Sequence, residues 1–264
     1  MEIVVCAKQV PDTESFIKVG PDGKSIDTTG IKWVLNFFDE SGVEEALRIK
    51  EKVGGTITVL SVGPQRTVEA LRQGMAMGAD KSILVDDPTA EGSDPAGIAK
   101  ILAAVIKGIP HDIIFCGFRT TDDESSQVGL MLAEQLGIPH LPPAIKLEIS
   151  GDQKAVKVES GVEGGMLTLE APLPAVITVG RGLNEPRMAS LPGIMKAKKK
   201  PIDTKKLADL GIDPATVGAA AAKVKIQNMT LPPERKAGQI IEGASVQEKA
   251  AKLAQLFKEE VKIL

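Results

Sequence analysis

The chain has 264 residues, of which 43% are hydrophobic and 25% charged, and its formal net charge is −3, which is the balance of an ordinary globular protein. Aromatic residues make up only 3%, with Trp33 as the single tryptophan and no tyrosine, so a stacking surface for single-stranded nucleic acid is not expected. The slightly acidic net charge also argues against general nucleic-acid binding.

Cysteine and histidine usage argues against a metal site and an oxidising compartment. Cys6 and Cys116 each lie inside an apolar run, as expected for buried thiols, and no Cys-x-x-Cys is present. His111 and His140 have no ligand spacing around them. The sequence starts without a leader pattern and no apolar run approaches 18 residues, so we expect a cytoplasmic protein that does not insert directly into membranes.

The first half of the chain alternates strand patterns with helix patterns. Apolar, β-branched runs predict buried strands at 2–7, 56–62, 82–85 and 112–116. Helical spacing follows each run, starting near Ser41 (a capping box with Glu44), at Thr67, at Asp94 and near Ser125. Successive βα units predict an α/β fold with a doubly wound, mainly parallel sheet. A small hairpin over 16–26 is expected to project from its edge.

The pattern changes after Pro139. Short strands separated by glycine turns are expected at 145–149, 156–159 and 166–169, as an antiparallel extension, before a buried strand at 175–179. The following stretch, RGLNEPRMASLPGIMKAKKK at 181–200, is expected to be an irregular loop, because Pro186 and Pro192 disfavour helix in the residues before them.

This loop has an apolar tip at 188–191, and basic residues flank the tip: Arg187, Lys196, Lys198, Lys199 and Lys200. The combination suits the docking of a partner, although a solvated surface loop has the same composition. We place a domain boundary behind it: residues 1–200 form the α/β domain with the loop, and residues 201–264 form a C-terminal arm. The arm ends in an amphipathic helix that starts at Ser245 and can pack on the chain itself or on a partner.

In a doubly wound sheet, ligands bind beyond the carboxyl ends of the strands. The loop after residue 117, GFRTTDDESSQVG, opens a helix whose free N–H groups suit a phosphate. Its acids, Asp122, Asp123 and Glu124, oppose that interpretation and can serve as helix caps instead, while Arg119 offsets them. No G-x-G-x-x-G, Walker A loop or G-x-S-x-G elbow is present. Redox chemistry in this chain therefore requires a cofactor.

Four stretches carry a resemblance to a known family. They are CAKQVPDT from residue 6, AMGAD from 76, TDDESSQVG from 121 and LNEPRMASLPGIMKAKKK from 183. Together they resemble the β subunits of electron transfer flavoproteins, over the chain from about residue 2. The resemblance implies an adenine-nucleotide-binding fold, similar to adenine nucleotide alpha hydrolases. It also implies a heterodimer with an α subunit that carries most of the FAD, and a buried AMP in this chain.

The resemblance further implies an electron carrier rather than an enzyme, which passes electrons from acyl-CoA or similar dehydrogenases toward a quinone oxidoreductase. Phe38 matches an aromatic residue that approaches the flavin, whereas Thr13 replaces a tyrosine of some members. The loop ends and the family positions together give the cofactor-binding residues Cys6, Ala7, Lys8, Asn36, Phe37, Phe38, Asp39, Val62, Gly63, Gly117, Arg119, Thr120, Thr121, Asp122, Asp123, Ser125, Ser126, Gln127, Val128 and Gly129.

For partner docking, Leu191 matches the family's anchoring leucine. Met188, Pro192, Lys196 and Lys198 accompany it. Two other functions stay open. The start at 10–13, VPDT, resembles electron-bifurcating members that bind a second FAD in place of AMP and oxidise NADH. A stand-alone adenine-nucleotide sensor would instead need no partner and would be a stable monomer.

Overall fold

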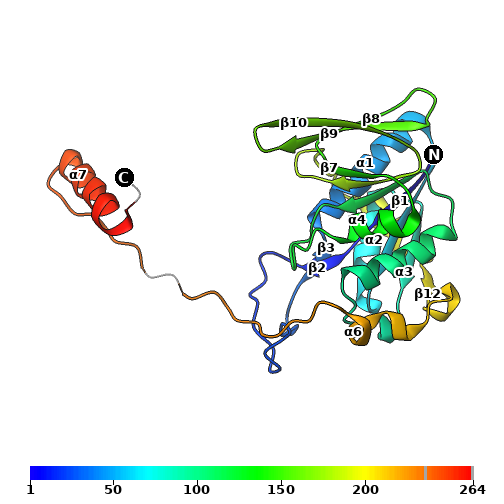
Figure 1. Ribbon diagram of the computed structural model, residues 1–264, viewed down its shortest axis with the longest axis horizontal. Helices are drawn as coiled ribbons and strands as arrows, with labels where there is room; N and C mark the ends of the chain where they lie inside the picture. The colour runs from blue at the N-terminus through cyan, green and yellow to red at the C-terminus, as the bar shows by residue number, and fades with distance from the viewer. Residues whose placement is uncertain (235–236, 263–264) are drawn as a thin grey trace.

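A seven-stranded sheet forms the centre of the computed structural model, which describes residues 1–234 and 237–262 (Figure 1). Its strand order is β12-β5-β4-β1-β6-β11-β7, and neighbouring strands are parallel throughout. The strands are β1 (Glu2–Cys6), β4 (Thr56–Val62), β5 (Lys81–Val85), β6 (Ile113–Gly117), β7 (His140–Ala144), β11 (Ala175–Val179) and β12 (Asp203–Lys205). The predicted doubly wound, mainly parallel sheet is confirmed.

Two hydrophobic layers cover the two faces of this sheet. On one face lie α1 (Phe37–Val53) and α2 (Val68–Met77), and on the other α3 (Pro95–Lys107) and α4 (Val128–Leu136). Successive residues of a strand point to opposite faces, so Ile3 and Val5 belong to the first layer and Val4 and Cys6 to the second. Short 3₁₀ turns, η1 (Gln65–Thr67) and η2 (Pro88–Ala90), precede α2 and α3.

The helix starts were only partly predicted. Asp94 caps α3 as expected, since its Oδ1 accepts a hydrogen bond from the Gly97 N–H at 3.0 Å. The capping box at Ser41 is wrong, because α1 already begins at Phe37 and the Ser41 hydroxyl donates to the Phe37 carbonyl oxygen at 3.3 Å inside the helix.

The antiparallel extension is confirmed as a three-stranded sheet, β10-β9-β8. It consists of β8 (Lys146–Ile149), β9 (Ala155–Val162) and β10 (Gly165–Pro172). The expected hairpin over 16–26 is reduced to a single bridge between Val19 and Ile26. Its base is closed by the antiparallel pair β2 (Gln9–Pro11) and β3 (Trp33–Leu35), so the projecting element is a loop held at its root.

The prediction of an irregular loop over 181–200 is wrong in its second half, which forms α5 (Leu191–Lys199). Ser190 caps this helix, since its Oγ accepts from the Gly193 N–H at 3.2 Å. Pro192 falls in the first turn, where its missing N–H has no intrahelical partner to lose. Ala197 is buried against α2, and a Cβ at Gly193 would collide with the Ala76 carbonyl oxygen. Residues 181–190 remain a loop.

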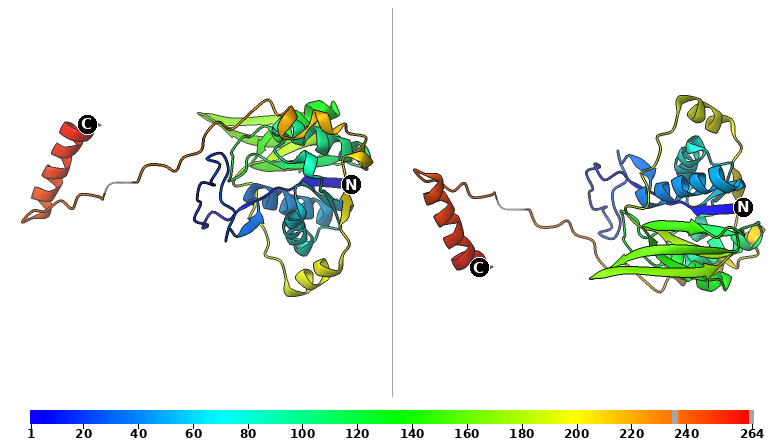
Figure 2. Two further views of the ribbon diagram at one scale, coloured as in Figure 1. Left: turned by 90° about the horizontal axis from the view of Figure 1, so that it is seen from below. Right: turned by 90° about the horizontal axis from the view of Figure 1, so that it is seen from above.

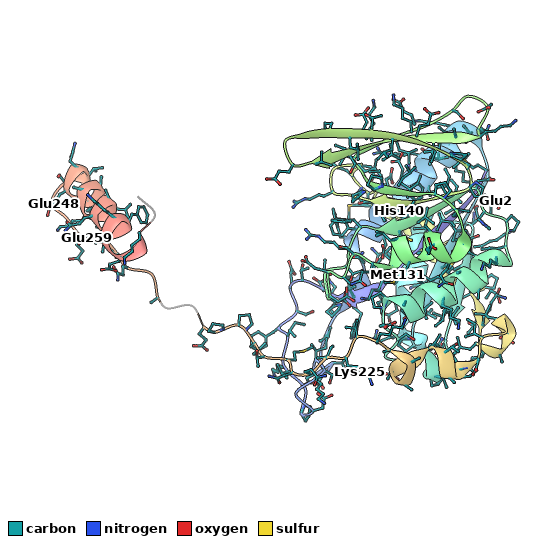
Figure 3. All side chains as sticks on the ribbon, in the orientation of Figure 1. Glu2, Met131, His140, Lys225, Glu248 and Glu259 are labelled. Carbon is teal, nitrogen blue, oxygen red and sulfur yellow. The ribbon has the colours of Figure 1, made fainter. Side chains whose placement is uncertain are left out.

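Beyond residue 200 the chain first packs on the sheet and then leaves it. After β12 come η3 (Ala208–Leu210), η4 (Pro214–Thr216) and α6 (Gly218–Ala221), with Leu207, Ile212 and Val217 buried. The final helix, α7 (Val246–Leu256), continues as a π-helical turn η5 (Phe257–Val261) and lies apart from the body in both views of Figure 2. Figure 3 shows Glu248 of α7 and Glu259 of η5 away from the α/β body. The division at residue 200 stays a prediction.

Candidate functional site

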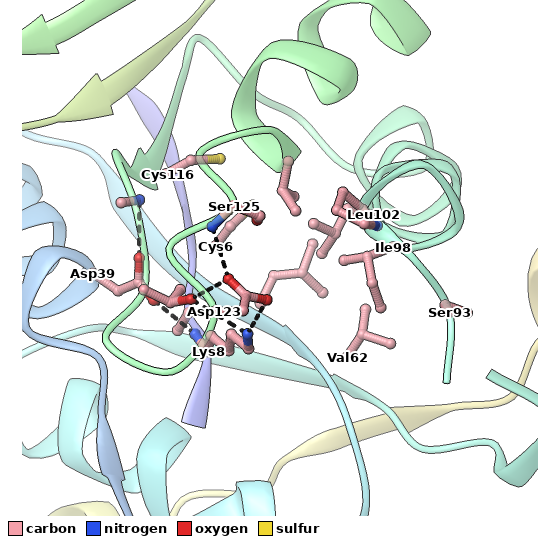
Figure 4. Close-up of a pocket in the computed structure, with 16 residues that line it drawn as sticks. Cys6, Lys8, Asp39, Val62, Ser93, Ile98, Leu102, Cys116, Asp123 and Ser125 are labelled. Atoms are coloured by element: carbon pink, nitrogen blue, oxygen red, sulfur yellow. Dashed lines mark hydrogen bonds and ion pairs between the residues drawn. The ribbon is translucent and has the colours of Figure 1, made fainter. Parts of the chain in front are cut away.

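A cavity of about 230 Å³ lies at the carboxyl ends of β1, β4 and β6 (Figure 4). Ten of the predicted cofactor-binding residues line it: Cys6, Ala7, Lys8, Asp39, Val62, Gly117, Thr120, Asp123, Ser125 and Val128. Six further residues of its wall were not predicted: Leu60, Ser93, Pro95, Ile98, Leu102 and Cys116. The start of α3 was missed although it follows β5, whose carboxyl end meets the same edge of the sheet.

The other predicted cofactor-binding residues do not line this cavity. They are Asn36, Phe37, Phe38, Gly63, Arg119, Thr121, Asp122, Ser126, Gln127 and Gly129. Some of them support its wall. A Cβ at Gly129 would lie 2.8 Å from the Thr178 Cγ2 and 3.3 Å from the Cys116 Cβ, so Gly129 lets α4 approach the sheet closely.

Asp39 ties together the ends of two neighbouring strands. One of its carboxylate oxygens accepts the Lys8 N–H at 2.8 Å and the other accepts the Gly117 N–H at 2.9 Å. Burial raises the pKa of Asp39 to about 7, against the opposing effect of hydrogen bonds from Lys8, Asn36 and Gly117. Gly117 is required at this point, because a Cβ there would collide with the Asp39 Oδ1 and lie 2.9 Å from the Phe38 Cβ.

The loop between β6 and α4 forms the polar side of the cavity. The Lys8 ammonium lies 2.8 Å from Asp122 and 3.0 Å from Asp123. Burial alone would lower the pKa of Lys8, but these two carboxylates raise it above its usual value. Glu124 and Ser126 adopt left-handed φ angles of 48° and 54°. The loop holds itself in this shape, since the Ser125 N–H donates to the Asp123 Oδ1 at 3.0 Å and the Glu124 N–H donates to the Thr120 carbonyl oxygen at 3.1 Å.

The opposite side of the cavity is apolar. Figure 4 shows Val62, Ile98 and Leu102 across from Lys8 and Asp123. The Cys6 and Cys116 thiols complete this region as buried groups at the ends of β1 and β6, as predicted. Contact with Cys6 and burial raise the pKa of Cys116 well above its usual value, so this thiol stays protonated.

These residues fit a nucleoside with an anionic end. Three apolar side chains, Val62, Ile98 and Leu102, form one wall that suits a base, while Thr120 and Ser125 lie at the polar end. The first N–H groups of α4 have no intrahelical partners. Val128 and Gly129 open α4 at this end of the cavity.

Phe38 and Arg119 lie together at the outer side of this edge. Phe38 is buried and meets the exposed ring of Phe37 edge to face, with centroids 5.7 Å apart. The Arg119 guanidinium carbon lies 5.8 Å from the Phe38 ring centroid, and its Nη1 lies 3.4 Å from a Glu124 carboxylate oxygen. The Asn36 side-chain amide donates to the Arg119 carbonyl oxygen at 3.1 Å, which links this pair to the start of α1.

All five residues predicted for partner docking are exposed. Met188 is 95% exposed and Leu191 is 72% exposed. Pro192, Lys196 and Lys198 lie on the solvent side of α5. We call residues 181–199 the recognition segment and residues 188–191 its apolar tip. Within residues 1–234 and 237–262, no group of three or more histidine, cysteine or acidic side chains could hold a metal ion. No helix in the same described ranges has the length and apolarity needed to span a membrane.

Comparison with known proteins assigns the family. Residues 24–210 match the family model of the electron transfer flavoprotein domain. The chain is 42% identical over 240 residues to the "Electron transfer flavoprotein subunit beta" of Bradyrhizobium diazoefficiens, covering 90% of this chain and 92% of that protein. The protein of that name from Bacillus subtilis is 38% identical over 265 residues, with 100% of both chains covered. The one from Mus musculus is 40% identical, covering 92% of this chain and 93% of the relative. The chain therefore belongs to the electron transfer flavoprotein family, among its β subunits.

Proposed function

We propose that this chain is the electron-carrying partner of an α subunit in a heterodimeric electron transfer flavoprotein, and that it holds a structural AMP. The observation that carries the proposal is the cavity, with its apolar wall on one side and, on the other, the polar loop between β6 and α4 that leads into the start of α4. The apolar wall suits a purine, and the Ser125 hydroxyl together with the first N–H groups of α4 suits a phosphate.

Each side of the cavity has a role in this proposal. Val62, Ile98 and Leu102 contact the adenine, and Thr120 and Ser125 face the phosphate. Lys8 is already neutralised by Asp122 and Asp123, so it supplies little uncompensated positive charge. A ligand with one phosphate group matches such a site better than a triphosphate does, because each further phosphate adds negative charge beside two carboxylates.

The flavin site lies outside the cavity in this proposal. The FAD, held mainly by the α subunit, supplies the electron-transfer chemistry when it is bound. Phe38 lies against the flavin side of the subunit interface. The Arg119 guanidinium holds the Phe38 ring through a cation–π interaction. The C-terminal arm (residues 201–264) contacts the α subunit, and its helix α7 has exposed Val246 and Leu253.

Electrons enter from acyl-CoA or related dehydrogenases that dock on the recognition segment, and they leave toward a quinone oxidoreductase. The exposed Leu191 supports this part of the proposal. Burial of one leucine side chain contributes about 2 kcal/mol, enough to anchor a transient complex. Lys196 and Lys198 add electrostatic steering toward an acidic partner.

The first experiment counts ligands. The chain is co-expressed with its α partner, the purified complex is denatured with acid, and FAD and AMP are quantified per heterodimer. One FAD with one AMP is the expected result. Two FADs without AMP would contradict the proposal in favour of the electron-bifurcating form, which NADH reduction would then test. A stable monomer that purifies without an α subunit would indicate a nucleotide sensor instead.

The docking part has its own experiment. Leu191→Ala is expected to raise the heterodimer concentration needed for half-maximal electron transfer from an acyl-CoA dehydrogenase by about tenfold, given the apolar area lost. Flavin content should not change. Leu130→Ala is the matched control, because Leu130 is also exposed, at 48%, but lies on α4. Equal kinetics for the Leu191 variant and the wild type would contradict docking through the apolar tip.

A further inference from the structure

The recognition segment is tied to α1 by a forked ion pair. The Arg187 Nε lies 2.8 Å from the Glu44 Oε2, and its Nη2 lies 3.1 Å from the Glu44 Oε1. The backbone N–H of Arg187 also donates to Glu44 at 3.1 Å. A second carboxylate, Glu51, accepts hydrogen bonds from Nη1 and Nη2 further along α1. The backbone and side-chain donors of one residue are thereby directed at a single helix face.

Glu44 is a buried acid, with only 4% of its side chain exposed. Burial pushes the pKa of Glu44 upward, but hydrogen bonds from the side chain and backbone of Arg187, and from Arg48, hold it below its usual value. A buried carboxylate without these partners would be strongly unfavourable. Because its acceptor Glu44 is buried, the Arg187–Glu44 ion pair is held more firmly than an ion pair on the surface.

Asn184 makes a second tie, three residues earlier in the chain. Its side-chain amide donates to the Ser41 carbonyl oxygen and to a Glu45 carboxylate oxygen, both at 3.0 Å. Both acceptors again belong to α1, and both residues are buried. Two side chains of residues 181–190 thus replace the regular backbone hydrogen bonds that this loop lacks.

The other end of the recognition segment and the adjoining Lys200 are held by α2 and by Ala79, which follows α2. The Arg72 guanidinium donates to the Ala197 carbonyl oxygen at 2.5 Å, and the Lys200 ammonium donates to the Ala79 carbonyl oxygen at 2.7 Å. Gly193 allows α5 to lie directly on the Ala76 backbone. The apolar tip spans the interval between these two sets of contacts, where Met188 and Leu191 project into solvent.

We propose that Arg187 and Asn184 are positioning residues, which clamp the recognition segment to α1 and thereby order its apolar tip before a partner arrives. The contacts of the clamp do not depend on the proposed function. Only its purpose, the docking of a dehydrogenase, rests on that function. An unclamped loop would lose conformational entropy on docking, whereas a clamped one has lost it on folding. The tip itself contacts the partner, and the clamp acts through the tip.

The first test measures order in the loop. In the heterodimer with the α subunit, amide hydrogen exchange of residues 182–190 is compared among wild type, Arg187→Gln and the milder Asn184→Ala. Exchange is expected to rise about tenfold in Arg187→Gln and less in Asn184→Ala, because local opening replaces a held conformation. Lys146→Gln is the matched control, since Lys146 also pairs with two carboxylates, Glu148 and Glu159, but on the antiparallel sheet. Unchanged exchange at 182–190 in both clamp variants would overturn the proposal.

The second test is a double-mutant cycle between the clamp and the tip. Arg187→Gln alone is expected to raise the apparent KM for the heterodimer in an acyl-CoA dehydrogenase assay about fivefold, with kcat unchanged, since only docking is affected. In a Leu191→Ala background the same change should have little further effect, because the clamp acts only through the tip. Equal effects of Arg187→Gln in the two backgrounds would overturn positioning as its role.

Failure of the proposed function is recognisable separately. If Leu191→Ala leaves docking unchanged while Arg187→Gln still loosens residues 182–190, the docking role is contradicted and the clamp is supported. If Leu191→Ala weakens docking and neither clamp variant loosens the loop, the docking role stands and the clamp is wrong.

Discussion

The cavity is lined by residues that come together from the carboxyl ends of β1, β4 and β6, whereas the recognition segment presents side chains outward from one stretch of chain. In the cavity, position is set by how closely backbones approach, as at Gly117. In the recognition segment, position is set by ion pairs and hydrogen bonds to two helices. We therefore expect the cavity to be disrupted by substitutions that add side-chain volume. We expect the recognition segment to be disrupted by substitutions that remove ion pairs or hydrogen bonds.

Asp39 gives the largest expected effect and makes the cavity sensitive to pH. Its pKa of about 7 when folded lies well above its ordinary value of 3.8, so the folded chain binds an extra proton between these two pH values. Stability therefore falls as pH rises from about 4 to 7, by about 4 kcal/mol from this group alone, and does not change further above pH 7.

The measurement is the free energy of unfolding of wild type and Asp39→Asn across that range. The advantage of the wild type over Asp39→Asn should shrink as pH rises from about 4 to 7. If the difference in unfolding free energy between wild type and Asp39→Asn is constant with pH, Asp39 is ionised in the folded chain throughout this range. The cavity would then have no pH sensitivity from this group.

Gly117→Val tests the dependence of the cavity on backbone approach. The new side chain would collide with the Asp39 Oδ1 and crowd the Phe38 Cβ. We expect a loss of about 1–3 kcal/mol in unfolding free energy, as for overpacking, together with loss of acid-releasable nucleotide from the heterodimer. Gly161→Val is the control, because Gly161 lies in β9 and no atom lies within 4 Å of the position that a Cβ would take there. A Gly117→Val chain that keeps full nucleotide content would contradict this account of the site.

The clamp is expected to respond to pH with the opposite sign. The carboxyls of Glu44 and Glu51 have pKa values below their ordinary range because the Arg187 guanidinium binds them, despite the burial of Glu44. Their contribution to stability is present above the ordinary glutamate pKa and is lost as pH falls through the lowered values. Hydrogen-exchange protection factors of residues 182–190 should therefore fall below about pH 4, under conditions where protonated Asp39 favours the cavity. A parallel response of both regions would break the comparison.

Lys198→Gln gives the smallest expected effect. Lys198 is exposed at the end of α5, so its charge acts on a partner through solvent. We expect the association rate with an acyl-CoA dehydrogenase to fall less than about threefold at low salt, and the difference to vanish at high ionic strength. Lys157→Gln, at an exposed position in β9, is the control. A large effect that persists at high salt would mean that Lys198 makes a direct contact.

The strands that were predicted well are those whose burial is encoded locally. Residues 56–62 and 175–179 are continuous apolar, β-branched runs, and both have the predicted bounds. β12 was missed because Asp203, Thr204 and Lys205 are polar, and only pairing with β5 makes them a strand. The α5 helix was missed because proline breaks a helix interior, although proline favours the first turn and Ser190, three residues before Gly193, is an N-cap signal.

The candidate site divides in the same way. Loop ends beyond strands are visible in a sequence, so Lys8, Asp39 and Ser125 were found from the pattern and lie on the cavity. The contact between Arg187 and Glu44 joins residues 143 positions apart, and no local pattern encodes it. The same holds for the pairing of Lys8 with Asp122 and Asp123 of the loop after β6, which offsets one of the two negative charges.

One helix serves both regions. The first turn of α1 carries Asp39 at the cavity, and the following turns carry Ser41, Glu44, Glu45 and Glu51 under the recognition segment. Each residue of an α-helix advances about 1.5 Å and turns about 100°. An insertion or deletion of one residue between Asp39 and Glu44 would therefore rotate the acceptors of the clamp away from Arg187 while Asp39 stayed in place. Between Asp39 and Glu51 the number of residues is therefore constrained as well as their identity. Natural insertions and deletions in this helix should be confined to the residues after Glu51.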